Sequence, residues 1–527
     1  MVEINRMAIL SYLQQIVREL HRGVAELNPF LVSLLVILFL LFWRKLTGGG
    51  KHKKLPPSPP KLPIIGNLHQ LGKLPHRSLH TLSKKYGPLM LLQFGHNKNL
   101  VVSSAEAARE MMKVHDIVFS NRPRITAANI FLYGCADIAF SPYGEYWRQV
   151  RKLGVIELLS LRRVQSFQFV REEEVAILLD EIRGACAAGA SVDLSEMLLA
   201  ISNNIASRCV IGRRADDEKF GKGKFAELSK RIMEQFAAFI SIGDMFPLLR
   251  WMDNLTGLIP QMKSSFREMD AFLDKVIEEH RIMESDDQPH SAEKDFAHIL
   301  LSLQKSCRLD FQLTPDHLKA ILMDMFVGGT DTTSTTMEWV MAELLKDPKL
   351  MRKAQEEVRR IVGKKLNVDV ADVDQMNYLK CIIKEALRLH PPAPLLVPRE
   401  TSAKVELGGY EIPPKTTVHV NVLAIQTDPR IWERAEEFLP ERFENNPVDF
   451  KGQDFQFIPF GGGRRGCPGI AFGMASAEFV IANLLYWFDW KLPDSGAAPE
   501  NLDMTEVFGI TVHKKIPLRV QPTLYHP

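Results

Sequence analysis

The most informative segment of this 527-residue chain reads Phe457-Ile458-Pro459-Phe460-Gly461-Gly462-Gly463-Arg464-Arg465-Gly466-Cys467-Pro468-Gly469. An apolar run rich in small residues follows it and predicts a helix from Ile470 to about Trp487. Cys467 falls at the expected N-cap, with Pro468 at the first helical position. Free backbone N–H groups, the positive end of the helix dipole and the two neighbouring arginines would favour its thiolate form. The segment therefore predicts a cysteine that acts as a metal ligand or as a nucleophile.

Three other interpretations of this segment are weaker. A nucleophilic cysteine would need a histidine base, and the nearest histidines, His419 and His513, are distant in sequence. A buried structural cysteine is disfavoured by the two flanking arginines. The spacing Gly461-x-Gly463-x-x-Gly466 also matches a dinucleotide-binding fingerprint, but too little chain follows it to build the sheet that this fingerprint requires.

A long helix is predicted upstream of this segment. Thr314 is a good N-cap, Pro315 suits the first helical position, and Asp347-Pro348 ends the helix. At about 1.5 Å per residue the helix is roughly 50 Å long. It can therefore cross a whole domain.

The middle of this helix reads Gly328-Gly329-Thr330-Asp331-Thr332-Thr333. Adjacent glycines inside a helix each cost roughly 1 kcal/mol relative to alanine, so another interaction must offset that cost. One interpretation is that a bulky flat group lies against Gly328 and Gly329, and that Asp331 and Thr332 relay protons. The other is a helix kink in which the Thr332 hydroxyl bonds back to a carbonyl. The residues alone give the two interpretations equal weight.

Glu385 and Arg388 lie three residues apart on a helix predicted over residues 378–389. Pairs at this spacing on an exposed helix face contribute only a few tenths of a kcal/mol. By itself the pattern predicts an exposed ion pair of little consequence.

The composition limits the classes of protein to consider. With 46% apolar residues the chain can bury a large core, and a net charge of +3 from 66 basic and 63 acidic residues gives no concentrated basic surface for nucleic acid. The six cysteines are scattered and include no Cys-x-x-Cys pair. A disulfide scaffold or a clustered zinc site is therefore not expected.

Four segments are expected along the chain. Residues 1–28 are predicted to form an amphipathic segment, 29–46 a transmembrane anchor, 47–66 a basic, proline-rich hinge and 67–527 one large domain. The lysines and arginines that follow the apolar run place the large domain on the cytosolic side of the membrane. The large domain is predicted to be mainly helical, because its strand-like runs are few and short.

Together these segments resemble a cytochrome P450, in particular the plant A-type enzymes of the seventy-one clan, from the proline hinge onward. The resemblance implies the cytochrome P450 fold: mainly α with small peripheral β-sheets, in a single large domain with an N-terminal membrane anchor. The motifs that carry it are the haem-binding loop Phe460-x-x-Gly463-x-Arg465-x-Cys467-x-Gly469, the oxygen-activating motif Gly328-Gly329-x-Asp331-Thr332-Thr333, Glu385-x-x-Arg388, Pro440-Glu441-Arg442-Phe443, Trp147-x-x-x-Arg151, Arg399 within residues 396–400, and the hinge Pro56-Pro57-x-Pro59-x-x-x-Pro63-x-x-Gly66-Asn67.

The resemblance implies a haem-thiolate catalytic domain over residues 67–527. Cys467 would be the iron ligand of haem b, and its thiolate would favour cleavage of the O–O bond. Asp331 and Thr332 would deliver protons to the bound oxygen. The other residues that would bind the cofactor, against its ring or at its propionates, are Phe460, Gly328, Gly329, Arg465, Trp147, Arg151 and Arg399.

Two further groups of residues take their roles from the resemblance alone. Glu385, Arg388 and Arg442 would form a buried Glu–Arg–Arg network instead of the exposed pair. A mostly apolar substrate pocket would be lined by Phe131, Leu132, Phe326, Leu396, Val397, Phe508 and Ile510.

The implied reaction inserts one atom of O2 into a C–H or C=C bond of a lipophilic small molecule, with a terpenoid or an alkaloid as the expected plant metabolite. The implied partner is NADPH–cytochrome P450 reductase, since the chain has no flavin or nicotinamide domain of its own, and Arg148, Lys152 and Arg464 are candidate contacts. The expected location is the endoplasmic reticulum membrane, spanned once, with the catalytic domain in the cytosol.

Three rival classes follow from the same residues. An oxygen-independent haem-thiolate isomerase or dehydratase would have less use for Asp331 and Thr332. A non-enzymatic haem-binding or membrane scaffold protein would not need the Gly-Gly-x-Asp-Thr segment. A nicotinamide-dependent reductase would require the glycine spacing to be a genuine fingerprint.

Overall fold

The structure is a computed structural model that describes residues 29–47, 54–217, 224–237, 241–285, 294–306, 311–493 and 498–526. The chain divides into two compact units, Met1–Leu55 and Pro56–Pro527. In the first unit, helix α2 (Pro29–Thr47) covers the apolar run predicted as an anchor. The predicted amphipathic segment 1–28 lies outside the described residues.

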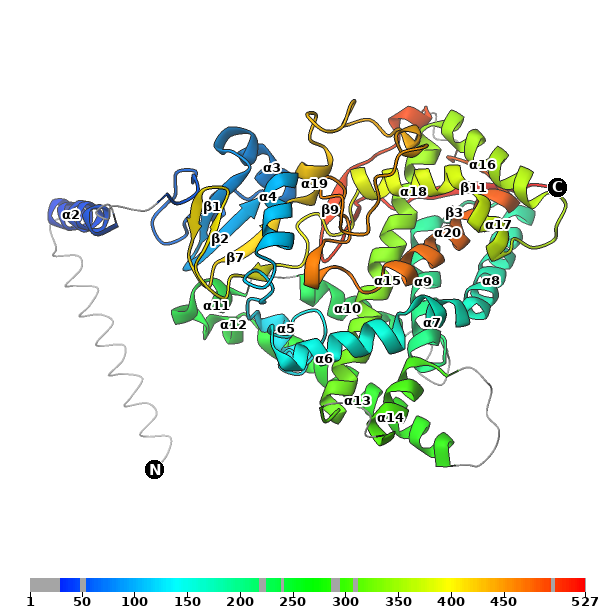
Figure 1. The fold of residues 1–527 in the computed structure, drawn as a ribbon, viewed down its shortest axis with the longest axis horizontal. Coiled ribbons are helices and arrows are strands. Elements are labelled where there is room, and N and C mark those ends of the chain that lie inside the picture. The colour runs from blue at the N-terminus through cyan, green and yellow to red at the C-terminus, as the bar shows by residue number, and fades with distance from the viewer. Residues whose placement is uncertain are drawn as a thin grey trace. The chain divides into compact units, whose positions relative to one another are not determined.

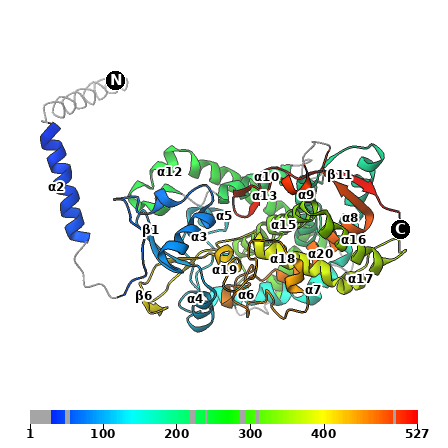
Figure 2. The same ribbon diagram turned by 90° about the horizontal axis from the view of Figure 1, so that it is seen from above.

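The second unit is mainly helical, as predicted (Figures 1 and 2). Helices α4 and α6 each continue into a five-residue π-helical turn, Glu110–Val114 and Gly154–Leu158. The α-helices are α3 (Pro75–Tyr86), α4 (Ala105–Arg109), α5 (Thr126–Phe131), α6 (Glu145–Leu153), α7 (Leu161–Ser166), α8 (Gln168–Ala187), α9 (Leu194–Ile211), α10 (Lys224–Ala237), α11 (Ile242–Met245), α12 (Met252–Leu255), α13 (Leu258–Ser285), α14 (Phe296–Ser306), α15 (Pro315–Lys346), α16 (Pro348–Val362), α17 (Val370–Gln375), α18 (Asn377–Leu389), α19 (Val422–Gln426) and α20 (Ile470–Trp487).

The strands of the second unit form small sheets. The four-stranded sheet has the order β1-β2-β7-β4, with β2 parallel to β7 and the other neighbours antiparallel, and it lies at one end of the helical body (Figure 1). The smaller sheets pair β5 with β6, β9 with β10, and β11 with both β3 and β8. The strands are β1 (Leu89–Phe94), β2 (Asn97–Val102), β3 (Val192–Asp193), β4 (Arg399–Glu400), β5 (Val405–Leu407), β6 (Tyr410–Ile412), β7 (Thr417–Val420), β8 (Phe488–Lys491), β9 (Glu506–Phe508), β10 (Val512–Lys514) and β11 (Arg519–Leu524).

Helix α15 runs through the middle of the core. Its 32 residues span about 48 Å, close to the predicted length. Thr314 caps it as predicted, accepting a hydrogen bond from His317 N at 3.2 Å, and the His317 side chain completes a capping box. Residues of α9, α18 and α20 pack around it, which places this helix where it can form one wall of an internal site (Figure 1).

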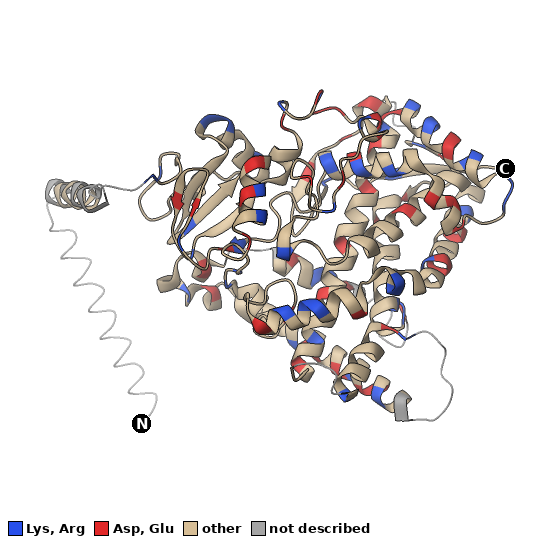
Figure 3. Cartoon of the chain, in the orientation of Figure 1, with Lys and Arg blue, Asp and Glu red and all other residues tan. Residues whose placement is uncertain are grey.

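Charge and hydropathy add two observations. Basic and acidic side chains are interspersed over the second unit in the view of Figure 3, in agreement with the small net charge. Helix α20 is also long and apolar enough to cross a membrane, but 61% of its most apolar window is buried, so it serves as a core helix.

Glu385 and Arg388 are fully buried, so the prediction of an exposed pair is wrong. Glu385 Oε1 accepts hydrogen bonds from Arg388 Nη2 at 2.8 Å and from Arg442 Nε at 2.9 Å, and Oε2 accepts one from Arg388 Nε at 2.8 Å. Arg388 also donates to the carbonyl oxygens of Gln426 and Ala435. The network joins α18 to the segment that leads into the Cys467 loop, a connection that helix spacing alone could not reveal.

Candidate active site

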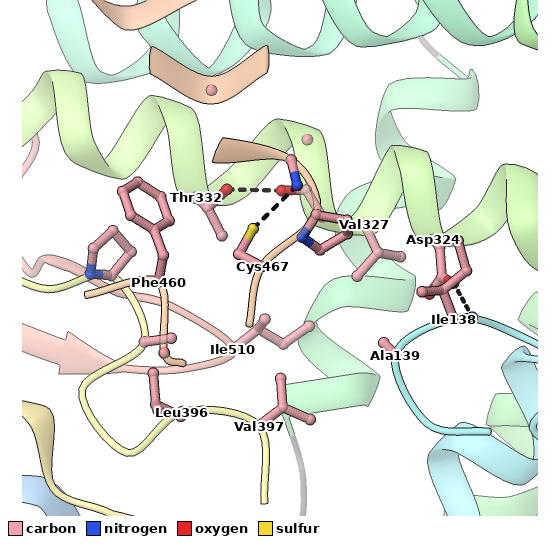
Figure 4. A pocket seen from close by; sticks show the side chains of 18 of the residues that line it. Ile138, Ala139, Asp324, Val327, Thr332, Leu396, Val397, Phe460, Cys467 and Ile510 are labelled. Atoms are coloured by element: carbon pink, nitrogen blue, oxygen red, sulfur yellow. Dashed lines mark hydrogen bonds between the residues drawn. The ribbon is translucent and has the colours of Figure 1, made fainter. Parts of the chain in front are cut away.

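A cavity in the second unit lies between α15 and the Cys467 loop (Figure 4). It brings together residues that are up to several hundred positions apart in the sequence. Of the residues predicted for a site, those that line it are Leu132, Arg151, Gly328, Gly329, Thr332, Leu396, Val397, Arg399, Phe460, Arg465, Cys467, Phe508 and Ile510.

The Cys467 sulfur faces this cavity (Figure 4). The loop is held by a hydrogen bond from Cys467 N to Phe460 O at 2.9 Å, and Gly469 N donates to Sγ at 3.4 Å. The prediction of Cys467 as the N-cap is wrong, because α20 begins at Ile470 with Gly469 as its N-cap. The first helical hydrogen bond runs from Gly473 N to Gly469 O at 2.9 Å, so the N-cap lies two residues later than predicted.

Burial raises the pKa of the Cys467 thiol, against the smaller opposing effects of Gly469 N–H and Arg151. Arg464 and Arg465, expected to stabilise the thiolate, are directed elsewhere: Arg464 to Asp116 and Arg465 to backbone carbonyls. Local charge therefore does not produce the thiolate. A bound metal ion would, since a coordinated thiol loses its proton to the metal.

Four guanidinium groups line the cavity: Arg122, Arg399 and Arg465, which are buried, and Arg151, which is half-buried. Their hydrogen bonds go mainly to neutral carbonyl oxygens, such as Arg465 Nη2 to Ser141 O at 2.5 Å and Arg399 Nη2 to Gly462 O at 2.6 Å. Arg399 alone of the four makes a carboxylate contact, at 3.4 Å to Asp116, among the ion pairs of the described residues.

The cost of this burial appears in the pKa values of the cluster. Desolvation, together with repulsion from Arg399, lowers the pKa of Arg465 to about 9, and desolvation lowers that of Arg399 to about 10. Desolvation and the neighbouring arginines also lower the pKa of Arg122. Buried charges need compensation, so this wall suits a ligand that carries carboxylates.

Arg122 was not predicted from the sequence. It is buried, and its Nη1 donates to the carbonyl oxygens of Val397 and Pro398, both at 2.7 Å. A single arginine before a proline gives no pattern that would have identified it.

Trp147 lies behind the cavity wall and does not line it. Its indole N–H donates to Ile138 O at 3.0 Å, and the Arg465 guanidinium lies over its ring, 4.1 Å from the ring centroid. Trp147 therefore supports Arg465, and its N–H is not directed into the cavity.

On the opposite wall, α15 is helical without interruption through Gly328 and Gly329. The Thr332 hydroxyl faces the cavity and donates to Gly328 O at 2.7 Å, the back-bond that was one of the two interpretations (Figure 4). Asp331 does not line the cavity, and its Oδ2 accepts a hydrogen bond from Thr511 Oγ1 at 2.5 Å.

A buried pair of carboxyl groups, Asp137 and Asp324, was also missed. Asp324 lines the cavity and accepts the Ile138 N–H at 2.5 Å (Figure 4). Burial, and then the neighbouring Asp137, raise the pKa of Asp324 well above its usual value. The available signal was its spacing, since Asp324, Gly328 and Thr332 follow each other at i, i+4 and i+8 on one helix face.

Apolar side chains make up most of the remaining wall. Phe131 and Phe326, predicted to line the pocket, do not: Phe131 stacks behind Phe236, and Phe326 faces a separate small cavity. On α15 the helical register places Met325 and Val327 at the main cavity instead of Phe326. Further lining residues absent from the prediction are Ile138, Ala139, Phe140, Phe236, Phe296 and Phe472.

These features can be tested for their fit to haem. A Cβ added at Gly328 would meet nothing within 4 Å, and one at Gly329 would make only ordinary contacts. Protein packing therefore does not require either glycine, whereas a flat group inside the cavity would. The cavity fits an iron porphyrin with carboxylate substituents in three ways. It offers a sulfur ligand, a glycine wall without side chains opposite that sulfur, and a cluster of guanidinium groups without carboxylate partners of sufficient number.

Comparison with known proteins agrees with this fit. Residues 56–517 match the family model described as cytochrome P450. The chain is 52% identical to phenylacetaldehyde oxime monooxygenase CYP71AN24 of Prunus mume, over 99% of this chain and 100% of the relative. It is 46% identical to strychnine-11-hydroxylase of Strychnos nux-vomica, over 95% of this chain and 97% of the relative.

A solved structure of a zebra fish cytochrome P450 with abiraterone superimposes with a TM-score of 0.70 at 27% identity, covering 86% of this chain and 100% of that one. The match therefore extends over nearly all of the second unit. Together with the cavity geometry, these similarities show that the chain belongs to the cytochrome P450 family, within its plant CYP71 group, and is a monooxygenase whose cofactor is haem b.

Proposed function

We propose that this enzyme inserts one oxygen atom from O2 into a C–H or C=C bond of a lipophilic plant specialised metabolite, with Cys467 as the iron ligand. The observation that carries the proposal is the cavity itself, which sets the Cys467 sulfur across from the glycine pair of α15. A thiolate-ligated haem supplies the iron at which O2 is bound and reduced.

Arg122, Arg151, Arg399 and Arg465 would hold the haem carboxylates. Their support is the uncompensated positive charge on that wall. Trp147 would fix Arg465 from behind, and Phe460 would lie along the cavity floor beside the cysteine loop.

Thr332 and Asp331 would have different roles in delivering protons to the cavity. The Thr332 hydroxyl already faces the cavity, and turning about its Cα–Cβ bond would free it from Gly328 O to donate there. Asp331 sits behind it in a chain of hydroxyl groups, because Thr335 Oγ1 lies 3.2 Å from Thr511 Oγ1, which in turn donates to Asp331. Neither Thr335 nor Thr511 lines the cavity, so the support for Asp331 as a proton source is its position next to Thr332 on α15.

The substrate would be an uncharged terpenoid or alkaloid. This proposal is supported by the apolar wall of the cavity, which is formed by Leu132, Leu396, Val397, Ile510 and their neighbours. An apolar wall contributes affinity by removing substrate surface from water, while a few polar groups set orientation. The Asp324 carboxyl group is the polar group on this wall that sequence reasoning missed.

Electrons would come from NADPH–cytochrome P450 reductase, docked beside the Cys467 loop. Arg151 ties α6 to this loop by donating to Gly466 O at 2.5 Å. Arg148 and Lys152, one turn apart on α6, are exposed on its outer face. Arg464 is half-exposed within the loop itself.

The enzyme would be held at the endoplasmic reticulum membrane. Helix α2 exposes a run of apolar side chains from Leu34 to Leu40, and the described part of the hinge, residues 54–66, is rich in proline and contains no helix. The second unit exposes apolar side chains of its own, with Leu248 92%, Leu255 76% and Ile64 74% exposed. Apolar surface of this kind marks contact with a membrane or a partner.

The decisive experiment is the absorbance spectrum of the reduced, carbon-monoxide-bound protein, for the natural sequence and for Cys467→Ala. The natural sequence should give the displaced main band of thiolate ligation, and the variant should lose both this band and NADPH-dependent turnover. A variant that keeps the band and oxidises its substrate with the reductase would overturn the assignment. Turnover by the natural sequence without NADPH would favour the isomerase or dehydratase class.

A further inference from the structure

A second group of potential ligand side chains lies outside the haem cavity. His280 on α13, Asp295 at the start of α14 and His298 on α14 come together, with their ligand atoms all within 4.8 Å of one another. None of them lines the cavity. The monooxygenase reaction therefore does not account for them.

The hydrogen bonds of His280 fix the position of its ring proton. Nδ1 lies 2.7 Å from Val276 O, which can only accept, so Nδ1 carries the hydrogen. Nε2 lies 2.9 Å from Asp295 Oδ2, a second acceptor. In the neutral ring two lone pairs would face each other, so a proton or a metal ion must lie between these atoms. An N–H donated to a backbone carbonyl is also the usual way in which a metal-binding histidine is oriented.

His298 approaches the other oxygen of the same carboxylate. Its Nδ1 lies 3.0 Å from Asp295 Oδ1, and its ring packs edge-on against the His280 ring with 4.4 Å between centroids. The side chains of His280 and Asp295 are 6% and 8% exposed, whereas that of His298 is 24% exposed. The cluster is thus rigid on its inner side and open to an entering ion or water at His298.

The arginine that acts on His280 is itself paired with an acidic residue. Arg213 and Glu279, charged neighbours of His280, pair with each other at 2.8 Å. Gly212, which ends α9, lies against the carboxylate so closely that a Cβ there would come within 2.6 Å of Asp295 Oδ2. A side chain at position 212 would therefore displace the carboxylate from between the two histidines.

We propose that His280, Asp295 and His298 bind one Zn2+ ion, or a chemically similar first-row ion, that joins α13 to α14. Two imidazoles and a carboxylate are a donor set that zinc accepts, with water as the fourth ligand. Tetrahedral bond lengths of about 2.0–2.2 Å place ligand atoms roughly 3.4 Å apart. The separations of 2.9 Å from His280 Nε2 and 3.0 Å from His298 Nδ1 to the Asp295 oxygens must each widen by a few tenths of an ångström to reach that value.

The test uses full-length holoenzyme without a histidine tag, first stripped of loosely bound metal with a chelator and then titrated with Zn2+. We expect one Zn2+ per haem, a Tm that rises until one equivalent has been added, and a zinc X-ray absorption spectrum with imidazole nitrogens as nearest neighbours. The haem spectrum, recorded in parallel, reports whether each sample is folded.

The informative variant is His298→Gln, because glutamine can still donate a hydrogen bond to Asp295 but is a poor zinc ligand. It should lower zinc affinity at least about 100-fold and leave the haem spectrum unchanged. His96→Ala, at an exposed histidine in the turn between β1 and β2, is the matched control and should bind zinc like the natural sequence. Equal zinc binding by natural sequence and His298→Gln, or no stoichiometric binding at all, would show that a proton bridges the cluster and would overturn the proposal.

Discussion

We infer that the Asp137 and Asp324 carboxyl groups share one proton. Asp137 is fully buried and its Oδ1 has no other hydrogen-bond partner in the described structure, whereas Asp324 is half-buried at the cavity wall. Burial raises the pKa of Asp137 to about 6, and burial with the charge of Asp137 raises that of Asp324 further. The shared proton fastens the loop at residues 137–140 to α15, since both carboxyl groups also accept backbone N–H groups of that loop.

The Asp324→Asn variant should change how stability depends on pH. A carboxyl group whose pKa is higher in the folded than in the unfolded state stabilises the protein at low pH, and loses that contribution as pH rises through the folded pKa. For Asp137 the loss falls between about pH 4 and pH 6, and is on the order of 3 kcal/mol. In the variant an amide N–H replaces the shared proton, so the Tm should fall less steeply with pH across this range than in the natural sequence.

Thermal unfolding from pH 4.5 to 8 would measure this effect. Asp316→Asn, at an exposed carboxylate in the first turn of the same helix, is the control and should keep the slope of the natural sequence. Parallel Tm curves for the natural sequence and Asp324→Asn would rule out the shared proton.

Glu385→Gln tests the buried network of Glu385, Arg388 and Arg442 near the C-terminal end of α18. Removing its charge leaves Arg388 and Arg442 without their common partner, and breaking a buried pair in this way costs about 3–5 kcal/mol. We expect a marked fall in Tm and in the yield of haem-loaded protein. Glu437→Gln, in the exposed i,i+3 pair with Arg434, should leave the Tm unchanged. Equal Tm values for the two variants would show that the buried network contributes no more to stability than an exposed ion pair.

At the scale of elements, sequence reasoning succeeds where local interactions determine the structure. The start of α15 follows from Thr314 and Pro315, and β1 follows from one apolar run, because capping and strand pairing involve near neighbours. It fails where a partner distant in sequence decides. Cys467 precedes the N-cap instead of occupying it, and Phe326 turns away from the main cavity because packing against other helices sets the rotation of α15.

The glycine pair of α15 allows a prediction that separates the stability of the helix from the binding of haem and substrate in the cavity. Alanine at Gly328 would gain about 1 kcal/mol of helix propensity and would clash with no protein atom. If haem and substrate occupy that space, Gly328→Ala should retain or raise the Tm while it lowers substrate affinity and the haem-to-protein ratio.

Gly184→Ala on α8 is the matched control, since its added Cβ also meets nothing within 4 Å but does not face the cavity. It should raise the Tm alone, with spectral titration of substrate unchanged. Unchanged haem content and substrate affinity in Gly328→Ala would mean that the glycine pair has no role at the cavity.

At the scale of the whole molecule, the proposed docking of the reductase on one side has to be reconciled with an almost balanced charge. The net charge of +3 gives no long-range attraction, so recognition must depend on a local group of charges. Around the Cys467 loop, Arg148 and Arg464 are each paired with an acidic residue of this chain, whereas Lys152 is exposed with no ion pair among those of the described residues. Lys152 is therefore available to form an ion pair with a partner protein.

Lys152→Glu should slow reduction of the haem by the reductase, and the effect should shrink as salt is added, because ions screen exposed charges over about 10 Å at 0.1 M. Stopped-flow reduction at low and high ionic strength measures it. Lys263→Glu makes the same charge change on α13, which lies on the opposite side of the second unit from α6 in Figure 2, and should have little effect at either salt concentration. If both variants slow reduction equally, overall charge guides the reductase. If only Lys152→Glu does, and only at low salt, the face beside Cys467 is the docking site, since a general loss of attraction would not distinguish two lysines on opposite sides of one molecule.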